Sequence, residues 1–414
     1  MQVPRALVRR PSLALSGLGM LAALALGPTG MGTVTAKTFQ TNSPLLGTFA
    51  QQELIAADGQ PGDAFGGLVA IDGSTLAVGA LFKNSNAGAA YVFVRSGATW
   101  SQRAELTASD SVAGDEFGSA VVFASSTEDG QPELLVGAQG KNSSSGAVYV
   151  FIRSGSSWLQ QQELTASDGK PNDLFGFDAK VSGSSLVVIA PGKASNTGAA
   201  YVFVQNGQNW TQQVELTASD GMAGDLFGYE AAISGSTVVV GAPFKNSNSG
   251  AAYVFNRVGG TWSQRQELTT PDPAAFFFGR SVVTAGSTVV VDAAGLGGGV
   301  AYVFTRTGAA LNLQQRLRAS DEVPGEAFGY AMAIDDSSLV LGAPGKNSFT
   351  GAAYVFTSSD AGWTQQAEFT PSDGAAGDDF GLYVAVGGPT VLVGAPFHAG
   401  AGAAYVFTPK LPGS

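Results

Sequence analysis

The chain has 414 residues, 57 of them glycine, no cysteine, and a formal net charge of −11 at pH 7. The acidic balance argues against nucleic acid or an anionic membrane surface as a partner. The absence of cysteine excludes a disulfide framework, a thiolate metal site and a cysteine nucleophile, so a packed core must hold the fold.

Residues 1–36 predict a secretory signal peptide. Three arginines within residues 5–10 precede an apolar stretch over about 13–26, and the small residues Val34 and Ala36 suit a cleavage site after Ala36. The stretch is short for a membrane span, so an uncleaved anchor is the weaker alternative. Cleavage would leave a net charge of −14 and no segment apolar enough to span a bilayer. The sequence therefore predicts an exported protein that is secreted, periplasmic or at the cell surface.

The pair Phe-Gly recurs seven times at intervals of 50 to 58 residues, and the run Tyr-Val-Phe recurs in step with it. The pairs begin at Phe65, Phe117, Phe175, Phe227, Phe278, Phe328 and Phe380, and the tyrosines are Tyr91, Tyr149, Tyr201, Tyr253, Tyr302, Tyr354 and Tyr405. A tryptophan follows in five copies. A period of this length without helical patterning is typical of a propeller blade.

Each copy holds four short strand candidates; in the fourth copy they cover 227–234, 237–241, 251–257 and 262–269. Turns rich in Gly, Ser and Asn separate them. The strands are apolar on both faces, as expected for sheets covered on both sides by neighbouring blades. We expect the repeated aromatic residues to form the core between blades. The sequence thus predicts an all-β fold, a seven-bladed β-propeller with four antiparallel strands per blade.

Residues 51–58 match the fourth strand of the other copies, whereas the chain ends shortly after a third strand at Phe407. We therefore expect an N-terminal strand over about 48–57 to complete the last blade and remove two exposed strand edges. One domain is predicted over 37–414. Its blades are expected at about 64–109, 116–167, 174–219, 226–271, 277–319, 327–371 and 379–408.

Together with the Phe-Gly pairs, the run Gly-Ala-Pro at 241–243, 342–344 and 394–396 and the run Gly-Ala-Ala-Tyr-Val-Phe carry a family resemblance. They resemble the FG-GAP repeats of the integrin alpha-subunit propeller and of exported bacterial proteins, over residues 51–408. The resemblance implies the propeller fold but says little about activity. The fifth copy departs most, because Asp292-Ala293-Ala294 replaces Gly-Ala-Pro there.

An acidic turn precedes six of the seven Phe-Gly pairs, and its second acid follows Gly or Asn. These residues favour a left-handed turn, in which the acid accepts backbone N–H groups. Cation or ligand binding is the alternative role. The second acids are Asp63, Asp115, Asp173, Asp225, Glu326 and Asp378.

The loop between the second and third strands of a blade should lie on the same face as these acidic turns, and it carries a lysine. The residues concerned are Lys83 and Asn84, Lys141 and Asn142, Lys193, Lys245 and Asn246, and Lys346 and Asn347. Exposed ion pairs of little energetic value are one interpretation, and a ligand-binding face formed with the second acids is the other. His398, the only histidine, takes the place of the lysine in the last copy. We expect it to be a surface variant without catalytic partners.

The resemblance to integrin-like repeats also implies one candidate calcium loop, between the first two strands of the second copy. Aligning Gly130 with the central glycine of such a loop places Ser125, Thr127, Asp129 and Glu133 at ligand positions. Ser and Thr stand where acids would bind more tightly, so a relic loop competes with a weak calcium site. No cofactor is required by the sequence.

The sequence favours an exported, non-catalytic binding, adhesion or scaffold protein whose partner is a protein or a glycan surface ligand. The alternative is a propeller-type glycan hydrolase or lyase with a pocket near the axis. Such an enzyme needs acids, histidine or arginine clustered in one or two blades, whereas the copies look uniform and contain no nucleophile motif. A ring that mainly assembles with itself is a third possibility.

Overall fold

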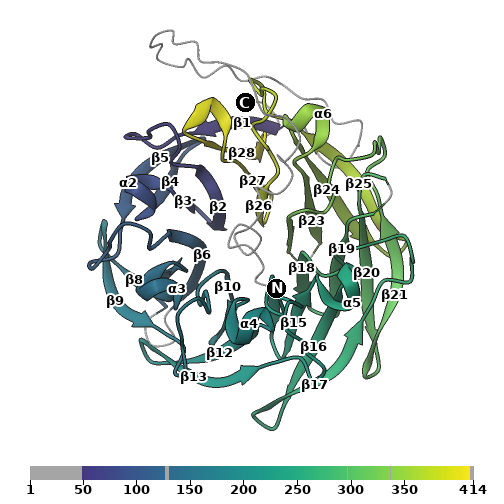
Figure 1. The fold of residues 1–414 in the computed structure, drawn as a ribbon. Coiled ribbons are helices and arrows are strands. Elements are labelled where there is room, and N and C mark those ends of the chain that lie inside the picture. Colours follow the sequence, from purple (N-terminus) through teal and green to yellow (C-terminus); the bar gives the residue numbers. More distant parts are fainter. Residues whose placement is uncertain (1–48, 126–129, 296, 336, 411–414) are drawn as a thin grey trace.

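The computed structural model describes residues 49–125, 130–295, 297–335 and 337–410. The strands in these ranges form seven antiparallel sheets of four strands, arranged around a central axis (Figure 1). This confirms the predicted propeller. The predicted signal peptide lies outside the described residues, and the boundary at residue 37 stays a prediction.

Each blade runs from an inner strand at the axis to an outer strand. Blade one is β2 (Phe65–Asp72), β3 (Thr75–Ala80), β4 (Ala89–Ser96) and β5 (Thr99–Leu106); blade two is β6 (Phe117–Ser125), β7 (Pro132–Ala138), β8 (Ala147–Ser154) and β9 (Ser157–Leu164); blade three is β10 (Ala179–Ser182), β11 (Ser185–Ala190), β12 (Ala199–Asn206) and β13 (Asn209–Leu216). Blade four is β14 (Ala231–Ser234), β15 (Thr237–Ala242), β16 (Ala251–Val258) and β17 (Thr261–Leu268); blade five is β18 (Val282–Ala285), β19 (Thr288–Ala293), β20 (Val300–Thr307) and β21 (Ala310–Leu317). Blade six is β22 (Met332–Ile334), β23 (Ser338–Ala343), β24 (Ala352–Ser359) and β25 (Gly362–Phe369); blade seven is β26 (Tyr383–Gly387), β27 (Thr390–Ala395), β28 (Ala403–Pro409) and β1 (Phe49–Leu54).

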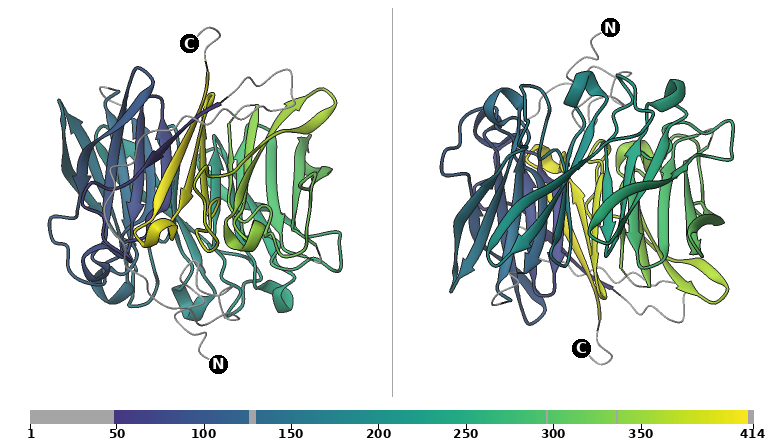
Figure 2. Two further views of the ribbon diagram at one scale, coloured as in Figure 1. Left: turned by 90° about the horizontal axis from the view of Figure 1, so that it is seen from above. Right: turned by 90° about the horizontal axis from the view of Figure 1, so that it is seen from below.

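Short helical turns join the second and third strands of most blades and gather at one end of the ring, which we call the loop face (Figure 2). They are α2 (Lys83–Asn86), α3 (Lys141–Ser144), α4 (Lys193–Asn196), α5 (Lys245–Asn248), α6 (Lys346–Phe349) and η1 (His398–Gly400).

Strand β1 closes the ring. It pairs with β28, with Phe49 opposite Pro409 and Leu54 opposite Ala404, and so becomes the outer strand of blade seven (Figure 1). The predicted closure is confirmed. The first and last strands of the described chain thus share one sheet.

The inner strand of blade four is shorter than expected, because β14 begins at Ala231 and not at Phe227. Leu226 and Gly228 have positive φ values of 53° and 83°, and the Tyr229 N–H donates to the Leu226 carbonyl at 3.0 Å. The Phe-Gly pair of this blade is therefore a turn. The residue after it is aimed at the axis, which matters for the pocket described below.

The repeated aromatic residues form the core between blades, as predicted. The phenylalanine of every Phe-Gly pair and the tyrosine of every Tyr-Val-Phe run are fully buried. In blade four the rings of Phe227 and Tyr253 meet edge to face with centroids 5.6 Å apart. Phe177 and Val187 of blade three belong to the same apolar cluster. Burial of each such ring contributes about 1.5–3 kcal/mol.

Backbones of neighbouring blades touch at the glycine that precedes each third strand. At Gly198, where φ is +88°, an added Cβ would lie 1.8 Å from the carbonyl oxygen of Phe227 in the next blade. The Phe227 N–H also donates to the Thr197 carbonyl at 3.1 Å. The motif therefore requires glycine because two main chains meet there.

Candidate functional site

On the loop face, the turn before the blade meets the lysine loop of the same blade in blades one to four and in blade six. In blade one, Nζ of Lys83 lies 2.5 Å from Oδ2 of Asp58 and 3.9 Å from Oδ2 of Asp63. The Tyr91 hydroxyl donates to Oδ1 of Asp58 at 2.8 Å. In each of these five blades the two predicted loops thus form one cluster, which we call the lysine cluster.

The lysine side chains of these clusters are buried, so the interpretation of these lysines as members of exposed ion pairs is wrong. Lys83, Lys141, Lys245 and Lys346 are 5–6% exposed, and Lys193 is only slightly more accessible. Their ammonium groups face the acids and not solvent. The neighbouring Asn84, Asn142, Asn246 and Asn347 are exposed and remain available to a partner.

A left-handed turn points each lysine inward. In blade one, Asn84, Ser85 and Asn86 all have positive φ values between 51° and 64°. Asparagine tolerates this conformation better than most residues. The Asn86 carbonyl accepts the N–H groups of Gly114 and Glu116 in the next blade at 3.1 and 2.8 Å. The loop therefore serves the packing of blades as well as the placing of the lysine.

The second acids cap their own turns. Oδ2 of Asp63 accepts the Gln60 N–H at 2.8 Å, and Gly62 in the turn has a φ of +94°. In five other copies, the second acid likewise accepts the backbone N–H of the residue three positions before it. These acids are Asp115, Asp173, Asp225, Glu326 and Asp378. All six are buried. The predicted structural role is present, and these carboxylates are turned away from an incoming ligand.

Lysine and burial shift the carboxyl groups of a cluster in opposite directions. The hydrogen bond from Lys245 lowers the pKa of Asp220, whereas burial raises the pKa of Glu267. An ionised aspartate paired with lysine stabilises the fold above the pKa of the unfolded side chain, about 3.9, and this stabilisation is lost as the pH falls through the folded value.

We expect Lys245→Met to lower the free energy of unfolding by about 2 kcal/mol at pH 7, because Asp220 loses a charged hydrogen-bond partner and Asp225 loses a cation 3.9 Å away. The difference from wild type should shrink between pH 5 and pH 3 as Asp220 is protonated. Thermal unfolding across that range measures it. Lys170→Met is the control, since the Lys170 side chain is exposed. Equal loss in both variants, or a loss independent of pH, would contradict this role.

Blade five keeps a cation without the lysine. Arg316 stands opposite Tyr302, where other blades have glutamate, and its guanidinium lies 5.9 Å from the centroid of the tyrosine ring. A positive charge thus accompanies the buried tyrosine in this blade too.

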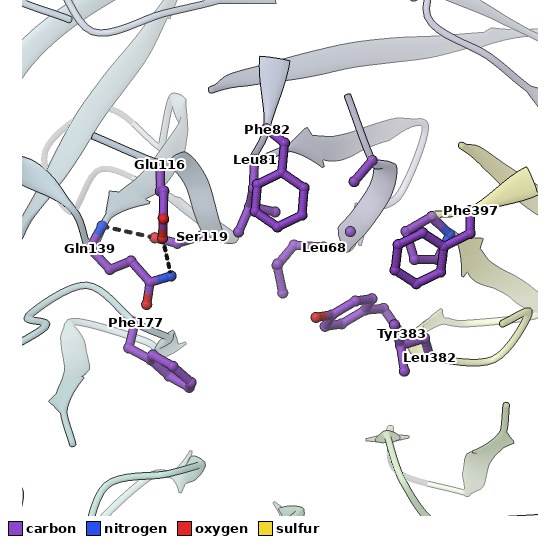
Figure 3. A pocket seen from close by; sticks show the side chains of 13 residues that line it. Leu68, Leu81, Phe82, Glu116, Ser119, Gln139, Phe177, Leu382, Tyr383 and Phe397 are labelled. Carbon is purple, nitrogen blue, oxygen red and sulfur yellow. Dashed lines mark hydrogen bonds between the residues drawn. The ribbon is translucent and has the colours of Figure 1, made fainter. Parts of the chain in front are cut away.

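The axis holds a second candidate site, lined by the innermost strands (Figure 3). Two adjoining pockets share Leu68, Leu382 and Tyr383, and enclose about 500 and 620 Å³ including the space open to solvent. The residue after each Phe-Gly pair lines one or both of them. These residues are Gly67, Ser119, Phe177, Tyr229, Arg280, Tyr330 and Leu382.

The pocket nearer the loop face is mostly aromatic and apolar. Figure 3 shows Phe82, Phe177, Tyr383 and Phe397 around a common space. Glu116 and Gln139 stand at its edge, where Gln139 Nε2 donates to Glu116 Oε2 at 2.6 Å. Concave, aromatic surfaces with a few oriented polar groups are typical of ligand sites.

The deeper pocket is charged. Lys180 Nζ lies 2.5 Å from Asp178 and 3.1 Å from Glu230. Arg280 pairs with Asp292 at 2.6 Å, and its guanidinium lies 4.4 Å from the centroid of the Tyr330 ring.

The charged lining gives the departure of the fifth copy from the repeat a structural role. Asp292, which replaces a glycine of the repeat, is fully buried, and burial raises its pKa to about 6 although Arg280 opposes the shift. The Nε atom of Arg280 is buried without a hydrogen-bond partner. The departure of this copy therefore installs an ion pair beside the axis.

Sequence reasoning missed the axial residues because it treated the copies as uniform. Their signal was present in the position after Phe-Gly, which takes six residue types in seven copies. The same reasoning expected no cluster of charges in one or two blades, yet blades three to five supply one at the axis.

The candidate calcium loop stays a prediction, because two of its four proposed ligands lie outside the described residues. Ser125 ends β6 and is exposed, and Thr127 and Asp129 lie outside the described residues. Glu133 is fully buried and accepts hydrogen bonds from Gln205 Nε2 at 2.8 Å and from Trp210 Nε1 at 3.0 Å. Its carboxylate is turned toward blade three, so Glu133 is not a ligand of this loop.

The FG-GAP repeat model matches residues 49–93, 100–151, 158–203, 210–255, 311–356 and 363–407, well over half of the chain. The chain belongs to the FG-GAP repeat family. Each match runs from the outer strand of one blade through the first three strands of the next. The matches leave out 256–310, which holds β17 of blade four and β18, β19 and β20 of blade five in this FG-GAP propeller. No curated protein sequence matches the chain significantly.

The FG-GAP fold is of a general binding or scaffold type, and its repeats are typical of extracellular proteins. Among the described residues, no helix is long and apolar enough to cross a membrane.

Proposed function

We propose that this FG-GAP propeller is an exported, non-catalytic binding protein, of adhesion or scaffold type, that takes a protein or glycan surface ligand at the axial end of the loop face. Export is supported by the signal predicted over 1–36. Equivalent positions of the seven copies carry the same kinds of residue at the periphery of the ring but different kinds at the axis. This contrast carries the proposal.

The contrast has a physical reason. Positions that hold blades together must repeat, since every blade packs against a similar neighbour. The lysine clusters and the buried tyrosines repeat in this way. Side chains that project into the axial space are not part of this repeated packing, so they are free to differ. Neighbouring ones meet in different ways, as aromatic rings at Phe177 and Tyr229 and as a cation over a ring at Arg280 and Tyr330. In Phe177, Tyr229 and Arg280 the chain places large, chemically distinct groups there.

Exposed apolar side chains on the loop face support a partner at this end. Val112, Met222 and Val323 occupy the acidic turns and are 54–67% exposed. Phe349, in α6 on the same face, is 37% exposed. A ligand seated at the axial pocket and extending outward would cover these groups.

Catalysis is the competing function, and the axial charges are the observation that favours it. The described acids of the deeper pocket already pair with Lys180 or Arg280. Burial also raises the pKa of Asp379 to about 7 at the position before a Phe-Gly pair. A non-catalytic role predicts that a bound glycan or peptide is recovered intact.

The test is binding of the mature chain to arrayed glycans and to peptides, with product analysis of every bound ligand. We expect Phe82→Ala/Phe397→Ala to weaken binding at least tenfold. Truncation should be tolerated, because Gly140, Gly192 and Gly345 occupy the same loop position in other blades. Val258→Ser is the control, since Val258 is 64% exposed on the opposite face. Unchanged affinity in the double variant would overturn the axial site, and turnover would overturn the non-catalytic role.

A further inference from the structure

Blade seven lacks the fixed cation that the other blades have beside their buried tyrosine. In blades one to four, lysine Nζ lies 2.5–2.8 Å from the first acid of the turn, and Lys346 pairs with Asp321 in blade six. Blade five has Arg316. His398 stands at this position in blade seven, and histidine, unlike lysine, is a common metal ligand through a ring nitrogen.

His398 has a full set of partners, contrary to the expectation of a plain surface variant. Its side chain is 12% exposed. Nδ1 lies 2.8 Å from Oδ2 of Asp378, while Nε2 faces Oε1 of Glu53 at 3.6 Å and Oδ2 of Asp373 at 3.8 Å. The Tyr405 hydroxyl donates to the other oxygen of Asp373 at 3.0 Å.

Asp378 fixes the tautomer of the ring. Its Oδ2 also accepts the Ala375 N–H at 2.7 Å, so it acts as an acceptor and takes the Nδ1–H of His398. Nε2 then faces two carboxylates, an arrangement that a cation bound between the three groups would stabilise. A carboxylate that holds the far nitrogen of an imidazole is the usual support of a metal-binding histidine.

The spacing fits a tetrahedral metal. Ligand atoms about 2.0–2.2 Å from zinc lie about 3.3–3.6 Å from one another, close to the 3.6 and 3.8 Å seen here. The three ligand atoms all lie within 4.8 Å of one another. A nitrogen ligand with two carboxylates suits zinc and its neighbours better than calcium, which prefers oxygen.

We propose that Glu53, Asp373 and His398 bind a divalent transition metal such as zinc, with Asp378 as the positioning residue and water completing the coordination. Glu53 belongs to the closing strand β1, Asp373 lies between β25 and β26, and His398 follows β27. The metal would therefore link the outer strand β1 to two loops, the one that leads into blade seven and the one that follows β27. Because the unfolded chain does not hold these three residues together, metal binding stabilises the ring.

The experiment uses the chelator-stripped mature chain at pH 7.5, with zinc binding followed by calorimetry and by thermal unfolding. Wild type should bind one zinc ion and melt several degrees higher with it. His398→Lys should lose this binding at least tenfold. Its metal-free Tm should match or exceed that of wild type, because lysine supplies the cation as in the other blades. Asp373→Asn should weaken zinc binding while keeping the fold.

Blade four provides a gain-of-function control. Lys245→His would place an imidazole among Asp220, Asp225 and Glu267, and it should add a second zinc site to the ring. The same zinc response in wild type and His398→Lys would show binding elsewhere on the surface and overturn the proposal. Absence of any zinc response in wild type would overturn it as well.

Discussion

Deletion of residues 37–57 is expected to abolish cooperative folding and to make the protein aggregate. Without β1, the β28 edge of blade seven loses its partner and presents unpaired backbone groups. The deletion also removes Phe49 and Leu54, each 2% exposed, and the Phe49 ring packs against Phe369 of blade six with centroids 4.9 Å apart. Closure of the ring depends on these contacts, because no other strand covers that edge within the described chain.

Two neighbouring residues allow the same test without a deletion. Leu54→Ser should lower the free energy of unfolding by about 3–4 kcal/mol, as expected for a buried leucine. Ile55→Ser should leave it nearly unchanged, since Ile55 is 59% exposed. Addition of a peptide of residues 49–57 to the truncated chain should restore a cooperative transition. If the truncated chain melts like the intact one, β1 does not close the ring.

Gly198→Asn is expected to lower the free energy of unfolding by on the order of 4 kcal/mol. The new Cβ would lie 1.8 Å from the carbonyl oxygen of Phe227. The Cβ is fixed by its own backbone and the oxygen belongs to the main chain, so neither atom can move aside by a side-chain rotation. Relief requires that blades three and four separate, which also exposes the buried ring of Phe227. Equilibrium denaturation measures the loss.

Gly235→Asn is the matched control. Gly235 also has positive φ, at +54°, but an added Cβ there meets nothing within 4 Å. Asparagine tolerates the left-handed region, so this variant should unfold close to wild type. Equal effects at both positions would show that backbone conformation, and not contact between blades, decides the need for glycine at Gly198.

The number of blades and the closure were predictable because they depend on features that repeat along the chain. Buried aromatic residues such as Phe227 and Tyr253 must recur wherever a blade packs on its neighbour. The phase of the repeat at residues 51–58 indicated the missing outer strand. The extent of the inner strands was not predictable from apolar pattern alone, since positive φ at Leu226 and Gly228 interrupts it.

The direction of the lysines was not predictable from local sequence. Lys83 is followed by Asn, Ser and Asn, a polar run that indicates solvent exposure. The left-handed turn reverses the chain, and Asp58, which lies 25 residues earlier, captures the ammonium. The energetic value of a charge pair depends on this burial, which only the tertiary structure provides.

The axial pocket and the proposed metal site arise from ring closure. Asp178, Glu230 and Arg280 come from different blades, and only the ring brings them to one axis. Glu53 and His398 lie near opposite ends of the chain and meet through β1 and β28. No spacing rule along the sequence relates such residues.

The pairing of β1 with β28 also sets an order for assembly during synthesis. β1 has no strand to pair with until β28 has been synthesised, so a partly made ring carries an unpaired strand. Such a chain stays open until β28 is made, which would suit the export proposed above. The finished ring then forms by one late docking event at the seam.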